Sequence, residues 1–180
     1  MWSSAARLHS HGPYGPHGPL DGLVGMFGFD GDATDEIGDA IIETYSGTVS
    51  FVLDGVRGQV LDNGVGALAI NSAALANLVD QDEWTVTMWV YQTSTSSYTH
   101  LINRYDKNTR TSGSSVLRGG FAAYVTGNRV YVERQDNSGN SVHTCQTDDN
   151  ALGTLSLNSW HHISLISRAT SLEIYIDGQK

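Results

Sequence analysis

A chain of 180 residues suits one domain plus a tail, and its many valine, isoleucine and threonine residues, against only two lysines and five glutamates, favour β-structure. The formal net charge of −9 disfavours nucleic-acid partners, which require a basic face, and docking on anionic lipid, but it permits divalent cations. The lone Cys145 cannot supply a disulfide framework, and no segment approaches the ~18 consecutive apolar residues of a membrane span, so we expect no membrane insertion.

Residues 1–21 are rich in glycine, proline, serine and histidine, and they carry too little apolar surface to bury a core. We therefore expect an extended arm here, followed by one domain over residues 22–180. Inside the arm, "GPYGPHGPL" (12–20) forms three Gly-Pro-X triplets that hold all three prolines of the chain. A collagen triple helix requires glycine at every third residue, but three triplets are too few to hold one alone.

Two interpretations of the triplets stay open: a short triple-helical neck beneath domains that already trimerise, and a stiff polyproline II arm that lies on a neighbouring chain. Both predict assembly with copies of the same chain, as a trimer or a higher oligomer, and with other assembly proteins. The residues expected to mediate it are the apolar anchors and the triplet positions of the arm, namely Trp2, Leu8, Gly12, Pro13, Gly15, Pro16, Gly18 and Pro19.

From Leu23 onward, short β-prone runs alternate with turns. The first run is "LVGMFGF" (23–29), and the acidic turn "DGDATDEIGD" (30–39) follows it. One segment, "NSAALANLVD" (71–80), predicts a short helix. The remaining strand predictions are "GTVSFVL", "GALAIN", "WTVTMWVYQ", "HLINRY", "GGFAAYV", "NRVYVERQ", "NSVHTCQ", "WHHISLIS" and "SLEIYI".

Some turns and strand faces are directly visible in the sequence. Gly127-Asn128 suits a two-residue hairpin turn between Phe121–Thr126 and Arg129–Arg134, and "DNSGN" (136–140) predicts the next hairpin. In "NRVYVERQ", Val130 and Val132 share one face of the strand; "SLEIYID" alternates in the same way. Many short antiparallel strands without βαβ alternation predict an all-β fold, an antiparallel jelly-roll β-sandwich.

Four segments, in order along the chain, resemble the laminin G-like, concanavalin A-like jelly-roll family. "GLVGMFGFDGDATDEIGD" is similar to the opening strand and Asp-rich turn of that family, and "GVRGQVLDNGVGALAIN" to its Gly-x-Ala-x-x-Phe segment. "WTVTMWVYQTSTSS" resembles its central strand with an inward tryptophan. "WHHISLISRATSLEIYIDGQK" resembles its closing hairpin, which reads Trp-His-His, an apolar alternation and then Tyr-x-Asp-Gly.

The resemblance implies a concanavalin A-like sandwich in which Trp89 and Trp160 are largely buried. It also implies a further closing strand after "DGQ", so a chain that ends at Lys180 leaves a sheet edge open near residues 23–29. An open edge of this kind can pair with a strand from a partner.

The glycoside hydrolases of this fold need two carboxylates across one cleft, on a strand that reads Glu-x-Asp-x-Glu or a close variant. No such run occurs, and the nearest pair, Glu173 and Asp177, is better explained as a solvated strand face and a turn aspartate. His161-His162 has no Ser/Asp neighbour or metal spacing, and the resemblance makes both residues structural. Cys145 shares a strand face with His143, and we expect a buried, inert thiol. The sequence therefore predicts no enzyme activity.

The acidic turn offers hard oxygen ligands that suit Ca²⁺, carried by Asp30, Asp32 and Asp35. It is not an EF-hand, because Asp35 stands where that loop needs glycine. The resemblance adds weight to Asp35, since the family often holds Ca²⁺ near this turn; a solvated turn is the alternative. Three histidines of the arm could bind a transition metal, although such a cluster is more often incidental: His9, His11 and His17.

The opening "MWSSAARLHSHG" lacks the apolar core of a secretory signal peptide, so a native Met1 would mean no export by that route. A jelly roll with an assembly arm and no disulfide then fits a protein that assembles in the cytoplasm and leaves by lysis. The sequence thus predicts a non-catalytic structural or attachment module of a multimeric surface assembly, with the virion surface favoured and a surface glycan as a candidate ligand. The alternatives are a carbohydrate-binding module of a bacterial extracellular protein and a glycan-cleaving enzyme.

Overall fold

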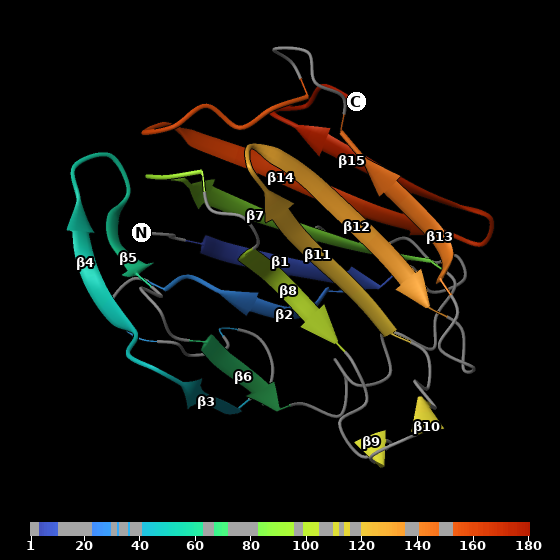
Figure 1. Ribbon diagram of the computed structural model, residues 1–180. Coiled ribbons are helices and arrows are strands. Elements are labelled where there is room, and N and C mark those ends of the chain that lie inside the picture. The colour runs from blue at the N-terminus through green and yellow to red at the C-terminus, as the bar shows by residue number, and fades with distance from the viewer. Residues whose placement is uncertain are drawn as a thin grey trace, which may run out of the picture.

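The computed structural model describes residues 4–10, 23–29, 32, 36, 41–62, 67–71, 83–95, 99–104, 110–111, 114–115, 120–135, 141–147 and 153–180. Every regular element among these residues is a β-strand, and the paired strands are antiparallel. The two larger sheets lie face to face as a sandwich, with smaller strand pairs beside them (Figure 1). Within these ranges, no helix has the length and apolar character needed to cross a bilayer.

One layer is a five-stranded sheet with the order β15-β14-β7-β1-β2. β7 lies at its centre and pairs with β14 on one side and with β1 on the other. The bounds of these strands are Ser4–Ser10 (β1), Leu23–Phe27 (β2), Trp84–Tyr91 (β7), Trp160–Arg168 (β14) and Ser171–Ile176 (β15).

The other layer is a four-stranded sheet with the order β13-β12-β11-β8. Its strands are Thr99–Arg104 (β8), Gly120–Thr126 (β11), Arg129–Gln135 (β12) and Ser141–Gln146 (β13). The remaining strands pair two by two, as Ile41–Ser46 (β3) with Ala67–Asn71 (β6), Ser50–Asp54 (β4) with Gly58–Asp62 (β5), and Arg110–Thr111 (β9) with Ser114–Ser115 (β10).

The two sheets enclose a hydrophobic core, because apolar residues recur at every second position of the strands that face it. Along β7, Trp84, Val86, Met88 and Val90 are buried, and the residues between them are half-buried. The ring of Trp84 contacts the ring of Phe121 in β11, with centroids 4.5 Å apart, and so joins the two layers. Both sheets, the β4–β5 pair and the adjoining loops supply further core residues: Phe27, Phe29, Leu61, Ala123, Val125, Val130, Val132, Leu155, Ile163, Leu165, Leu172, Ile174 and Ile176.

The fold is an antiparallel β-sandwich of the jelly-roll type, as the sequence predicts. Every predicted strand run overlaps an observed strand, whereas β1, β3, β5, β9 and β10 were not among the predicted runs. The turn between β11 and β12 is the predicted one: Thr126 lies opposite Arg129, and Gly127 has a φ of +66°, which glycine adopts without strain. The predicted alternation of Val130 and Val132 with half-buried Tyr131 and Glu133 is also confirmed.

The structure corrects the predicted boundary between arm and domain. Ser4–Ser10 form β1, which lies between β2 and β7 inside the five-stranded sheet, so Leu8 belongs to the sandwich. The prediction weighed only apolar side-chain area, whereas a strand is also held by backbone hydrogen bonds to both neighbours. "SAARLHS" contains no glycine or proline to interrupt such a ladder. β2, the expected open edge, pairs with β1 alone among the described strands.

The two tryptophans expected in the core are not there. Trp89 and Trp160 are half-buried, because the alternation of β7 directs Trp84 inward and Trp89 to the outer face. Trp160 lies opposite Tyr91 in the β14–β7 ladder and shares that outer face. The predicted helix at 71–80 lies outside the described residues, apart from Asn71, which ends β6.

Replacing Ile163 with alanine should lower the free energy of unfolding by about 2–5 kcal/mol, because this fully buried side chain leaves a cavity between the sheets. Ile166 belongs to the same strand, but its half-buried side chain faces outward, so Ile166→Ala should cost clearly less. Chemical denaturation of both variants measures the difference. Equal losses would contradict the assignment of the inner face of β14.

Candidate functional site

The outer face of the four-stranded sheet carries three aromatic side chains in line, which we call the tyrosine row: His100 of β8, Tyr124 of β11 and Tyr131 of β12. They lie directly opposite one another across the three strands. The rings of Tyr124 and Tyr131 are parallel within 2°, with centroids 5.2 Å apart, and the His100 ring meets Tyr124 edge-on at 6.1 Å. Cross-strand aromatic contacts of this kind hold the rings in fixed orientations.

A β-bulge in β8 brings His100 into the tyrosine row. Ala123 lies opposite Ile102, but the next residue, Tyr124, lies opposite His100, so Leu101 is the extra residue. In a regular ladder, Leu101 would stand beside Tyr124. The bulge instead leaves Leu101 partly buried against the core and His100 exposed.

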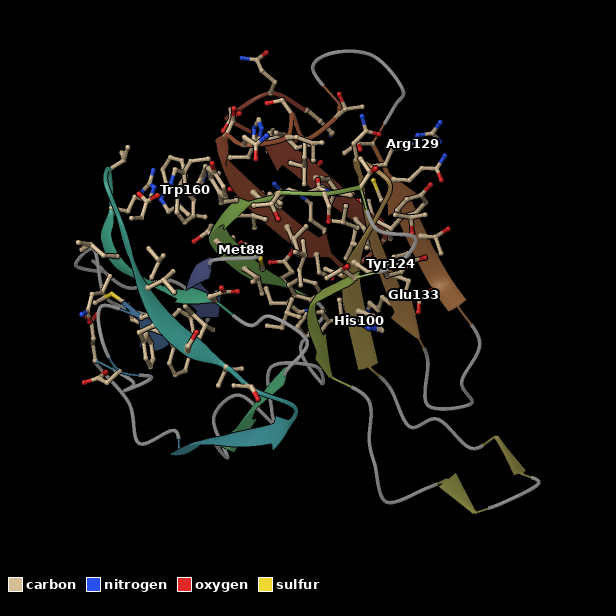
Figure 2. All side chains as sticks on the ribbon, turned by 60° about the vertical axis from the view of Figure 1, so that its left-hand side comes forward. Met88, His100, Tyr124, Arg129, Glu133 and Trp160 are labelled. Atoms are coloured by element: carbon tan, nitrogen blue, oxygen red, sulfur yellow. The ribbon has the colours of Figure 1, made fainter. Side chains whose placement is uncertain are left out.

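One carboxylate adjoins the tyrosine row. Glu133 is half-buried two residues beyond Tyr131, on the same face of β12, and lies opposite the small Ala122 (Figure 2). Desolvation lowers the pKa of His100 from its ordinary value of 6.5, although the charge of Glu133 opposes this shift. His100 is therefore largely uncharged at neutral pH. The face thus presents rings, hydroxyls, an imidazole and a carboxylate, which are groups that orient small polar ligands.

The outer face of the five-stranded sheet carries a second aromatic group, covered by the β4–β5 hairpin. Trp89 contacts His162 with ring centroids 5.0 Å apart, and Tyr91 contacts Trp160 at 5.3 Å. The guanidinium carbon of Arg57 lies 3.4 Å from the centre of the Trp89 ring and 5.2 Å from that of Trp160, a cation–π arrangement. We call these five residues the Arg57 cluster.

Asp54 fastens the hairpin turn to the Arg57 cluster. Its Oδ1 accepts hydrogen bonds from the backbone N–H groups of Val56 (2.9 Å) and Arg57 (2.8 Å) and from the indole N–H of Trp160 (3.2 Å). These bonds, that from Val56 above all, hold the pKa of Asp54 below its ordinary value. Figure 2 shows Trp160 next to the β4–β5 hairpin. The hydrogen bond between Asp54 and Trp160, together with the stacking of Arg57 on Trp89, docks this hairpin on the sheet.

Three residues near the start of β14 form a hydrogen-bonded chain. His161 Nδ1 lies 2.7 Å from Asp177 Oδ2, and His161 Nε2 lies 2.9 Å from Ser156 Oγ. The backbone N–H of Ser156 also donates to His161 Nε2 at 3.0 Å, and that of His162 donates to Asp177 Oδ1 at 2.8 Å. The order of groups is that of a serine-hydrolase triad, but the Ser156 N–H occupies the lone pair that a nucleophile's proton requires. The chain instead ties a loop and a turn to β14.

This chain corrects the expectation that His161 has no Ser or Asp neighbour. His161 and Asp177 are 16 residues apart, and the β14–β15 hairpin brings them together. Spacing in the sequence does not reveal such a contact, because it depends on the register of the hairpin. The Trp-His-His and Tyr-x-Asp-Gly motifs therefore meet in one structural network.

The two carboxylates that come nearest to a catalytic pair in the sequence are engaged elsewhere. Glu173 binds Lys180 Nζ at 2.8 Å and accepts the Tyr175 hydroxyl at 3.2 Å. The hydrogen bond from Lys180 lowers the pKa of Glu173, so this carboxyl stays ionised and is a poor proton donor. Asp177 belongs to the chain with Ser156 and His161.

Cys145, which the sequence predicts to be buried, is partly exposed. Its half-buried side chain packs against the core from β13. Burial raises the pKa of the thiol above its ordinary value, which disfavours the nucleophilic thiolate.

Most of the predicted metal and assembly residues lie outside the described ranges. Asp30 and Asp35 are among them, while Asp32 is described and exposed. In the part of the chain that the structure describes, no three His, Cys, Asp or Glu side chains gather closely enough to hold a metal ion. Of the assembly residues, Leu8 alone is described, as part of β1; the others are Trp2, Gly12, Pro13, Gly15, Pro16, Gly18 and Pro19.

Comparison with known proteins identifies one family. Residues 62–180 match a laminin G-type family model, described as the concanavalin A-like lectin/glucanase superfamily. The match covers more than half of the chain and includes the tyrosine row and the whole of β14 and β15. No curated protein and no solved structure gives a significant match to the chain.

Acidification should destabilise the protein partly through His162. Burial of its ring holds the pKa of His162 below the ordinary value of 6.5, so the unfolded chain binds a proton more readily than the folded one. This contribution to stability is complete above about pH 6.5 and is lost as the pH falls towards the folded-state pKa. Melting temperatures measured between about pH 7.5 and about pH 5 should therefore fall more steeply for the native protein than for His162→Gln. Parallel profiles would contradict this role of His162.

Proposed function

The chain belongs to the concanavalin A-like lectin/glucanase superfamily, and we propose that it is a non-catalytic attachment module that binds a glycan. The observation that carries the proposal is the tyrosine row, in which the Tyr124 and Tyr131 rings stand parallel on a strand face. His100 and Glu133 flank these rings with polar groups. The site is therefore a sheet surface, built on four strands held by the core.

Sugar chemistry fits this combination of groups. A sugar ring has apolar C–H faces, which pack on aromatic rings, and a rim of hydroxyls, which hydrogen-bond to carboxylates, imidazoles and phenols. Tyr124 and Tyr131 offer two rings held in register, and His100 and Glu133 offer polar partners of different character. Because the rings are held by cross-strand packing, binding costs little additional ordering of the protein.

The carboxylates favour binding over hydrolysis. Glycosidases need an acid and a second carboxylate on opposite sides of the scissile bond. Among the described residues of β8, β11 and β12, Glu133 is the one that carries a carboxylate. The ionised carboxylate of Glu173 pairs with Lys180, and that of Asp177 lies against His161. The proposal is therefore recognition without turnover.

The wider setting of the module is proposed from the sequence. The triplets in residues 12–20 support a multimeric surface assembly with copies of the chain and other assembly proteins, on a virion in the first place. A bacterial extracellular protein is the alternative setting. Ca²⁺ at Asp30, Asp32 and Asp35 belongs to the same proposal, because the acidic turn offers the oxygen ligands that this ion prefers.

Glycan binding should depend on the tyrosine row. Screening on an immobilised glycan array, followed by calorimetry with the best oligosaccharide, should give an affinity that Tyr124→Ala and Tyr131→Ala each weaken about tenfold or more. The matched control is Tyr175→Ala, which removes a half-buried tyrosine from the outer face of the other sheet. Unchanged affinity in both row variants, or an equal loss in the control, would contradict the assigned site.

The bound oligosaccharide should not be cleaved. Prolonged incubation with the native protein, followed by measurement of new reducing ends, should give the same value as incubation without protein. Glu133→Gln is the informative variant, because Glu133 is the carboxylate beside the rings. Reducing ends that appear with the native protein and disappear with Glu133→Gln would show a glycosidase and overturn the proposal.

A further inference from the structure

The guanidinium group of Arg57 lies on an aromatic surface, and its N–H groups have no acceptor within the part of the chain that the structure describes. It stacks on Trp89, and its backbone N–H binds Asp54, but no carboxylate or carbonyl of the described residues takes a hydrogen bond from the guanidinium itself. By contrast, Arg168 and Lys180 both pair with Glu173. An arginine head carries five N–H donors in a planar fork that matches a carboxylate.

The fork is held in place before any ligand arrives. The Trp89 ring supports one face of the guanidinium at 3.4 Å, and Asp54 Oδ1 fixes the turn through the N–H groups of Val56 and Arg57. Gly58 ends the turn with a φ of +77°, a conformation that glycine adopts without strain. A side chain that is already ordered loses little entropy when it binds.

The same hairpin exposes two aliphatic side chains. Leu53 and Val56 are each 82% exposed, the highest values among the large hydrophobic residues that the structure describes. Leu53 directly precedes Asp54 and Val56 directly precedes Arg57 in the chain, so apolar groups and a cation whose N–H donors have no acceptor among the described residues share one hairpin tip. Arginine and tryptophan beside apolar residues are typical of the energetic centres of protein interfaces.

We propose that the hairpin tip, residues 53–57, is a docking site for an acidic peptide segment of a partner protein. A carboxylate of the segment accepts two N–H bonds from Arg57, and a neighbouring apolar side chain of the segment packs on Leu53 and Val56. A peptide fits better than a sugar, because Arg57 already covers the Trp89 ring face that a sugar would stack on, whereas the exposed groups are aliphatic. This surface lies on a different sheet from the tyrosine row, and the inference stands independently of glycan binding.

The test uses the full chain and three probes: a capped tetrapeptide of alternating glutamate and leucine, its glutamine counterpart, and glucuronate. Calorimetry should detect the glutamate peptide, and the glutamine peptide should bind about tenfold or more weakly. Arg57→Gln should weaken the glutamate peptide by a similar factor. Arg57→Lys should also weaken it, because a lysine head lacks the planar fork. The control is Arg168→Gln, an exposed arginine at the far end of the β14–β15 hairpin, which should have no effect.

Leu53→Ser keeps the test decisive if changes at Arg57 disturb the hairpin. Leu53 is almost fully exposed, so this variant should retain the melting temperature of the native protein and still bind the peptide more weakly. Equal affinity for the glutamate and glutamine peptides, or unchanged affinity in Arg57→Gln and Leu53→Ser, would overturn the proposal. Binding of glucuronate as tightly as the glutamate peptide would overturn it too, in favour of an acidic saccharide.

Discussion

The contact between Trp84 of β7 and Phe121 of β11 joins the two sheets. It fixes which face of each strand points into the core, and therefore which side chains lie on the outer surface. With ring centroids 4.5 Å apart, the two side chains lie in the layer between the sheets. Because side chains alternate along a strand, burial of Trp84 sends Trp89 and Tyr91 to the outer face of one sheet. Burial of Phe121 similarly leaves Tyr124 on the outer face of the other. The candidate functional surfaces thus lie on the outer faces of the two sheets, opposite the faces that form the core.

The two outer faces use their aromatic residues differently. On the five-stranded sheet, Arg57 of the β4–β5 hairpin covers the Trp89 ring, and Asp54 accepts a hydrogen bond from the indole N–H of Trp160. Those rings therefore hold a hairpin in place. On the four-stranded sheet, Tyr124 and Tyr131 stack on each other, and an imidazole and a carboxylate lie beside them on the same face. This contrast explains why the tyrosine row is the stronger candidate for glycan recognition, and why the hairpin tip suits a protein partner.

The end of the sandwich where β14 begins is held by polar groups. Gln92 is 1% exposed, and its amide donates to the carbonyls of Ser94 and Gly127, which links the end of β7 to the β11–β12 turn. The chain of Ser156, His161 and Asp177 holds the neighbouring loop and turn. These bonds give the Trp-His-His and Tyr-x-Asp-Gly motifs a structural reason that does not require catalysis.

Local patterns predicted the strands well, and contacts between distant segments poorly. The alternation in "NRVYVERQ" correctly placed Tyr131 and Glu133 on one face, because this property needs only the period of a strand. The alignment of His100 with Tyr124 depends on a bulge, which no local pattern in "HLINRY" indicates. Trp89 was misplaced because both faces of its strand are partly apolar. β1 was missed because it has few apolar residues, so the sequence does not show the backbone pairing that holds it in the sheet.

The central claim is that glycan binds on the tyrosine row, and backbone amide chemical shifts of the isotope-labelled protein test it most directly. Titration with the oligosaccharide selected by array screening should perturb the amides of β8, β11 and β12 around His100, Tyr124 and Tyr131. The amides of β14 and of the β4–β5 hairpin should remain unchanged. Perturbations confined to the Arg57 cluster or to the Ser156–His161–Asp177 chain, with the tyrosine row unaffected, would contradict the account.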